Sequence, residues 1–129
     1  MKEFVLALMI VSTSSVAWAQ APPNKIADKK FIFMSTFLIG TTIFDSESTF
    51  AALDKCNNTC KEGNTLMRPF INSGRPATYA VQGTIDTGLI VWSYKMKKDG
   101  NKLWWLLPVV SGAAHTVAGG FNMRFVLVP

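Results

Sequence analysis

Residues 89–110 read LIVWSYKMKKDGNKLWWLLPVV, and this stretch decides the fold that the sequence predicts. Its Asp-Gly pair at 99 and 100 accepts the positive φ angles of a tight two-residue turn. When the flanking residues are paired as antiparallel strands, they separate into one apolar and one basic face. The apolar face pairs Met96 with Leu103, Tyr94 with Trp105, Trp92 with Leu107 and Ile90 with Val109. We therefore expect a β-hairpin here, with Pro108 near a strand end or sheet edge.

Strand-like composition continues on both sides of this hairpin, with many aromatic, β-branched and hydroxylic residues. The further segments expected as strands are residues 31–44, 65–72, 78–85 and 121–128. Helical spacing of apolar residues is confined to residues 45–60, and the small-residue stretch 111–120 is expected to be a loop. The predicted fold class is therefore α+β, an antiparallel sheet of about five to six strands with one helix packed on it.

The N-terminus has the pattern of an export signal. Lys2 is followed by an apolar run over residues 4–11, and Ala17-Trp18-Ala19 offers small residues to a signal peptidase. We expect residues 1–19 to be a signal peptide, because the apolar run is too short for a spanning helix; a permanent anchor is the alternative. Residues 20–30 then form an extended leader, and residues 31–129 form a single β-rich domain. The expected localisation is periplasmic or secreted.

The composition limits the function classes. A chain of 129 residues holds one domain at most, and 49% hydrophobic residues exclude wholesale disorder. The formal net charge of +5 favours acidic partners without choosing among them. Phosphate-binding glycine motifs are absent from the sequence, so no nucleotide or other cofactor is expected.

The two cysteines, Cys56 and Cys60, are expected to form a disulfide. Two cysteines of an exported protein usually become oxidised to a disulfide in an oxidising compartment. The bond is easier to form if Cys60 lies beyond the last turn of the helix. Free thiols and redox chemistry are the alternatives, but three residues separate Cys56 from Cys60, whereas two residues separate the cysteines of redox motifs. A metal site is not expected, since His115 is the only other soft ligand in the sequence.

The candidate binding residues lie at the hairpin tip. Four lysines gather there beside a tryptophan: Lys95, Lys97, Lys98, Lys102 and Trp104. Such a basic patch with an aromatic neighbour suits acidic polymers, an acidic protein or lipid headgroups. The alternative is a solvated turn whose lysines prevent edge-to-edge aggregation of the sheet. We expect the partner to be an envelope component or another protein. Contact with a membrane surface is compatible with this expectation, and nucleic acid is not expected as a partner.

Catalysis is not expected. His115, with Ser111 four residues before it and Asp86 or Asp45 as orienter, invites a comparison with hydrolase sites. The surrounding sequence lacks the strained nucleophile turn of such enzymes, so His115 is interpreted as an ordinary loop residue.

The sequence leads to two hypotheses of function. The first is a small exported non-catalytic binding or inhibitor-type module that acts in the periplasm or outside the cell. The second is a structural subunit of a surface fibre or secretion assembly that uses strand exchange, for which the leader and the terminal strand would serve. The oligomeric state does not follow from the sequence.

Overall fold

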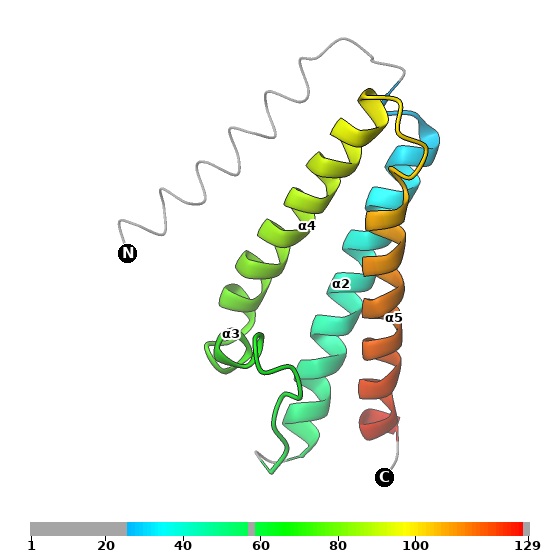
Figure 1. Cartoon of the computed structure of the whole chain (residues 1–129). Coiled ribbons are helices and arrows are strands. Elements are labelled where there is room, and N and C mark those ends of the chain that lie inside the picture. The colour runs from blue at the N-terminus through cyan, green and yellow to red at the C-terminus, as the bar shows by residue number, and fades with distance from the viewer. Residues whose placement is uncertain (1–25, 57–58, 128–129) are drawn as a thin grey trace, which may run out of the picture.

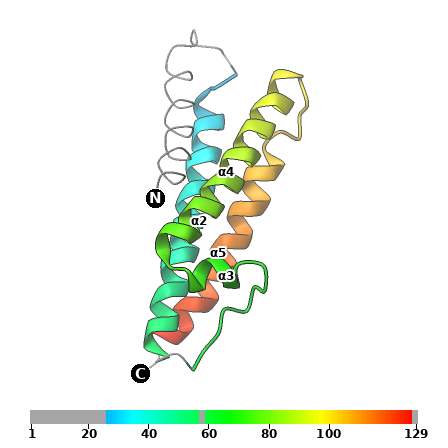
Figure 2. The same ribbon diagram turned by 90° about the vertical axis from the view of Figure 1, so that its left-hand side faces the viewer.

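In the computed structural model, which describes residues 26–56 and 59–127, the chain is a bundle of helices. The three long helices are α2 (Lys29–Lys55), α4 (Arg75–Lys98) and α5 (Leu106–Leu127), and the short α3 (Arg68–Asn72) precedes α4. They lie side by side in an up-and-down arrangement (Figures 1 and 2). The predicted α+β fold is wrong, because none of the described residues forms a strand.

The predicted β-hairpin is in fact the end of α4, a short loop and the start of α5. Asp99 caps the C-terminus of α4, and Gly100 adopts a φ of 77° in the turn that follows. An Asp-Gly pair satisfies a hairpin turn and a helix C-terminus equally, since both require positive φ. Pro108 lies in the first turn of α5, where its missing N–H costs nothing, so it does not mark a strand end.

The remaining strand predictions fail for a common reason. Residues 31–44 lie inside α2, and residues 78–85 lie inside α4. The expected loop 111–120 and residues 121–127 of the expected final strand belong to α5. Residues 65–72 form a turn and α3. Of the predicted helix 45–60, residues 45–55 form the second half of α2, and the described residues 56, 59 and 60 lie beyond its end. Aromatic and β-branched composition favours strands only weakly, and packing against neighbouring helices overrides it here.

Local capping signals explain where the helices begin. The side chain of Asp28 accepts a hydrogen bond from the Phe31 amide at 2.9 Å, which caps α2. Gly74, with a φ of 96°, and Pro76 start α4. Residues 29 and 30, which the sequence assigns to the leader, are thus the first residues of α2. The predicted signal peptide and residues 20–25 of the leader lie outside the described residues.

The predicted disulfide is confirmed. Cys56 is the C-cap residue of α2 and is bonded to Cys60, with their Cα atoms 5.6 Å apart. Cys60 lies beyond the helix, as the geometry of a short ring requires.

Two glycines of α5 let it approach α2 closely, and this pair has the most extensive contact in the bundle. A Cβ atom added at Gly112 would come within 2.5 Å of the Phe37 ring, and one at Gly119 within 2.5 Å of the Phe44 ring. Side chains larger than hydrogen are therefore excluded from these positions unless the helices or rings move.

The bundle buries polar side chains and exposes apolar ones. Buried apolar residues of the described chain are few, namely Phe31, Leu38, Phe50, Ala52 and Ile71. Buried polar residues include Thr42, Ser46, Ser48, Thr49, Thr78, Gln82, Asp86 and Ser93. Eighteen large apolar residues of the described chain are exposed. In the described residues, the usual distribution of an apolar interior and a polar exterior is therefore partly reversed.

Candidate functional site

The sequence-predicted lysines lie at the end of the bundle where α2 begins and α4 meets α5, which we call the lysine-rich end (Figure 1). Its exposed lysines are Lys29, Lys30, Lys95, Lys98 and Lys102. With Lys97 included and Asp28 and Asp99 subtracted, six lysines and two aspartates give this end a formal charge of +4. The end therefore attracts anionic surfaces.

Lys97 and Trp104 have a different environment from the exposed lysines. The Lys97 ammonium is 2.5 Å from an Asp28 carboxylate oxygen and 4.3 Å from the centre of the Trp104 ring. The same contact with Lys97 lowers the pKa of Asp28. Lys97 thus joins the end of α4 to the start of α2 and makes a cation–π contact with Trp104.

Aromatic packing holds this end together. The Phe31 ring lies 5.7 Å from the Tyr94 ring and 5.9 Å from the Trp104 ring, measured between centroids. The Ser93 hydroxyl donates a hydrogen bond of 2.6 Å to the Trp104 carbonyl, which ties the loop to α4. Large apolar side chains around this cluster remain exposed, namely Ile32, Phe33, Trp92, Leu103, Trp105 and Leu106.

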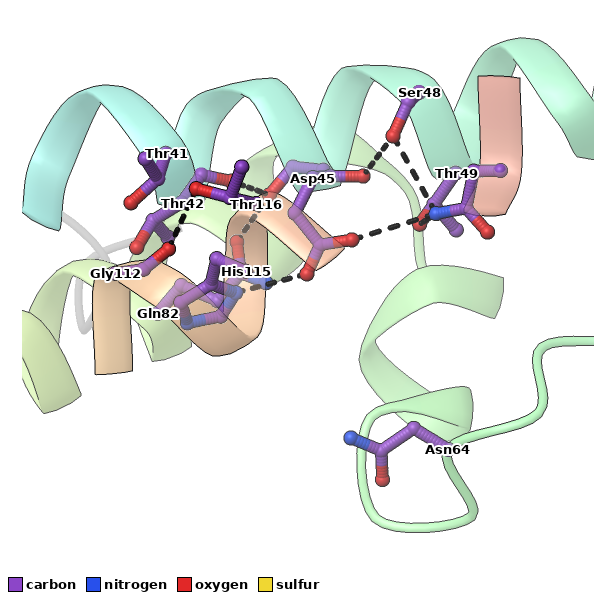
Figure 3. Close-up of polar contacts among 12 residues, drawn as sticks. Thr41, Thr42, Asp45, Ser48, Thr49, Asn64, Gln82, Gly112, His115 and Thr116 are labelled. Carbon is purple, nitrogen blue, oxygen red and sulfur yellow. Dashed lines mark hydrogen bonds and ion pairs between the residues drawn. The ribbon is translucent and has the colours of Figure 1, made fainter. Parts of the chain in front are cut away.

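A second candidate site is a polar cluster between α2, α4 and α5. Figure 3 shows His115 of α5 and Asp45 of α2 pointing toward one another, with Nδ1 of His115 and Oδ2 of Asp45 2.8 Å apart. The Asn122 amide donates to Oδ1 of Asp45 at 3.3 Å and to the Thr49 hydroxyl at 2.7 Å. The contact with Asp45 raises the pKa of His115, and its burial opposes that rise.

The polar cluster borders a cavity of about 340 Å³. Its walls come from all three long helices, from α3 and from the loop before α3. The polar lining residues are Asp45, Ser46, Thr49, Glu62, Asn64, Gln82, Asp86, His115 and Asn122, and the apolar ones are Met67, Ile71, Ile85, Ala118 and Phe121. The Ser46 hydroxyl and the Gln82 side-chain oxygen are hydrogen-bonded across the α2–α4 interface.

Asp86 is the most deeply buried carboxylate that lines this cavity, with 6% of the residue exposed. Burial raises its pKa, while the nearby Thr42 hydroxyl and the charge of His115 lower it. No Lys, Arg or His side chain in the described part of the chain forms an ion pair with it. A buried carboxylate without a cationic partner is costly, so Asp86 is a candidate binding residue.

The sequence pointed only to part of this site. It paired His115 with Asp86 or Asp45 as orienter, and the structure brings His115 to Asp45. Ser111 lies one turn earlier on the same helix, and no hydrogen bond joins these two described residues. Within residues 26–56 and 59–127, no three potential metal ligands gather.

The other residues of the cluster were missed, although the sequence carried a signal for them. Small or polar residues recur at helical spacing through apolar segments, at positions 42, 46 and 49, at 78, 82 and 86, and at 112, 115, 119 and 122. A period of three to four residues places each set on one helix face. The pattern is that of an amphipathic helix whose polar side faces inward, and a search for apolar faces overlooks it.

No protein-family model, curated protein or solved structure matches the chain. None of the helices in the described ranges has the length and hydropathy needed to cross a bilayer.

Proposed function

We propose that the protein is a non-catalytic binding module that acts after export and attaches to anionic lipid surfaces by its lysine-rich end. The observation that carries this proposal is the joint presence of five exposed lysines and exposed aromatic and aliphatic side chains at one end of the bundle. Lysines attract anionic headgroups, and tryptophans prefer the boundary between headgroups and acyl chains.

The exposed apolar residues favour lipid over a polar acidic partner. Phe33 is 66% exposed, Trp92 is 60% exposed and Leu103 in the loop is 54% exposed. An acidic polymer would pair with the lysines but would leave these side chains in water, whereas an interface accepts them to a depth of about 5–10 Å. Each lysine near an anionic surface contributes about 1 kcal/mol, so a few of them suffice for reversible attachment.

Co-sedimentation with vesicles tests this proposal. Binding is expected to phosphatidylcholine vesicles that contain phosphatidylglycerol, to weaken as salt is raised, and to be weak on phosphatidylcholine alone. The double variant Lys98→Gln/Lys102→Gln should bind about thirtyfold more weakly, since two lysines contribute about 2 kcal/mol. Lys97 is left unchanged because it holds Asp28 and Trp104.

The matched control removes two exposed positive charges far from the lysine-rich end. Lys61 follows the disulfide, and Arg124 lies near the end of α5. The variant Lys61→Gln/Arg124→Gln has the same net charge as the test variant, so it should bind vesicles as the parent does. Equal weakening in both variants would show an effect of total charge alone and would contradict the proposal, as would failure of the parent protein to bind.

A structural subunit of an envelope assembly is the second candidate function. Apolar residues away from the lysine-rich end favour it, among them Val117, Phe121 and Phe125 of α5, each more than half exposed. Since the described residues contain no strand, such subunits would pack through helix faces in place of exchanging strands. Light scattering coupled to size-exclusion chromatography separates the two functions, because a subunit self-associates without lipid and a lipid-binding module stays monomeric.

A further inference from the structure

We propose that the cavity between α2, α4 and α5 binds a small organic cation, with Asp86 as its counter-ion. This site is distinct from the lysine-rich end, and the proposal does not depend on lipid attachment. It rests on the position of Asp86, the charges of the other lining groups, and the size and apolar content of the cavity.

Asp86 is placed to meet a ligand. It belongs to α4, lines the cavity, and is nine-tenths buried. The Thr42 hydroxyl lies close enough to lower the pKa of Asp86, but it is itself buried and has no hydrogen-bond partner by geometry. A largely buried carboxylate without an ion-pair partner has an electrostatic preference for a positive ligand.

The other charged groups around the cavity also favour a positively charged ligand. Asp45 faces it from α2, and Glu62 faces it from the loop before α3. Among the described residues, His115 of α5 is the only positive candidate in the lining, and it is already paired with Asp45. Even with His115 protonated and all three carboxylates ionised, the lining carries a net charge of −2. Anionic ligands are therefore repelled, and cationic ones are attracted.

The size and the walls define the class of cation. About 340 Å³ is at the lower end of the range of small-molecule pockets, so the ligand is small. Gln82 and Asn122 offer amide groups, whereas Met67, Ile71 and Ile85 offer apolar surface. This combination suits an ammonium group on a short apolar body. A bare metal ion would leave the apolar wall unused, and the described residues provide no three-ligand cluster for it.

A matched set of three probes tests the charge preference. Tyramine, 4-ethylphenol and 3-(4-hydroxyphenyl)propionate share one phenol body and carry a positive, a neutral and a negative end. Chemical-shift titration of the full chain without lipid should give a dissociation constant of about 1 mM or tighter for tyramine. The neutral probe should bind at least tenfold more weakly, and the anionic probe should not bind. Equal binding of tyramine and 4-ethylphenol would overturn the proposal, as would no binding of tyramine.

Two variants test whether the Asp86 carboxylate is the group that binds the cation. Asp86→Asn should weaken tyramine binding at least tenfold, whereas the control Asp99→Asn, an exposed aspartate at the C-cap of α4, should leave it unchanged. Circular dichroism checks that both variants remain helical. If Asp86→Asn does not fold, acid titration of the parent protein replaces it, because tyramine stays charged as the carboxylates protonate and its binding must then weaken. Tyramine binding that persists in Asp86→Asn, or that is unchanged by acid, would refute the site.

Discussion

The close contact between α2 and α5 makes a quantitative prediction about two adjacent glycines. Gly119 and Gly120 are neighbours in α5, so alanine at either position gains about 1 kcal/mol of helix propensity. A Cβ atom at Gly119 would lie 2.5 Å from the Phe44 ring and 3.2 Å from the Cα atom of Asp45. A Cβ atom at Gly120 would meet nothing within 4 Å. The two substitutions therefore differ in packing alone.

The magnitude follows from these distances. Overpacking of this kind costs about 1–3 kcal/mol, and the Phe44 ring, which is 41% exposed, can relieve part of it by rotating outward. The backbone of Asp45 cannot move without shifting α2. We expect Gly120→Ala to raise the free energy of unfolding by about 1 kcal/mol. Gly119→Ala should leave it unchanged or lower it by up to about 2 kcal/mol.

Urea denaturation followed by circular dichroism at 222 nm measures both free energies. A second readout is the pKa of His115, the only histidine in the chain, which NMR reports without assignment ambiguity. Displacement of Asp45 by Gly119→Ala should lower that pKa toward the ordinary value of 6.5, and Gly120→Ala should not change it. Equal stabilisation by both substitutions, with an unchanged histidine pKa, would refute the close helix contact.

Three further predictions concern polar contacts and the disulfide. His115→Gln should lower the free energy of unfolding by about 1 kcal/mol at pH 5. The contact with Asp45 raises the pKa of His115. The difference in unfolding free energy is therefore fully present below pH 6.5 and is lost as the pH rises through the folded-state pKa of His115. A difference that does not depend on pH would contradict this prediction. Burial, and then the hydrogen bond to Glu47 of α2, raise the pKa of Tyr79 to about 12. The absorbance titration of the parent minus that of Tyr79→Phe should therefore have its midpoint near pH 12 and not near pH 10. Reduction of the Cys56–Cys60 bond should cost about 2 kcal/mol of stability in urea titrations and keep the helical spectrum, because the ring is small; loss of the fold would show a larger role for the bond.

Part of the candidate site was predictable from sequence, and part was not. Lys95, Lys98 and Lys102 were found because charged residues near a turn are exposed in either a hairpin or a helical hairpin. The pairing of Lys97 with Asp28 was not predictable, since the two residues are 69 positions apart. The sequence named Asp86 or Asp45 as the orienter of His115, but it could not choose between them. His115 and Asp45 are 70 positions apart and meet only because α5 packs along α2.

The sequence by itself determined the features that depend on a few neighbouring residues. The turn at Gly100, the Cys56–Cys60 disulfide and the basic character of residues 95–102 are of this kind, because positive φ, a short ring and charge are local properties. The choice between strand and helix was decided by the tertiary structure. Alternation over residues 89–110 fits a hairpin. However, Gly112 and Gly119 let α5 lie against α2, and several polar residues at helical spacing then form hydrogen bonds with one another inside the bundle. That gain exists only when three helices are assembled, so no single segment could reveal it.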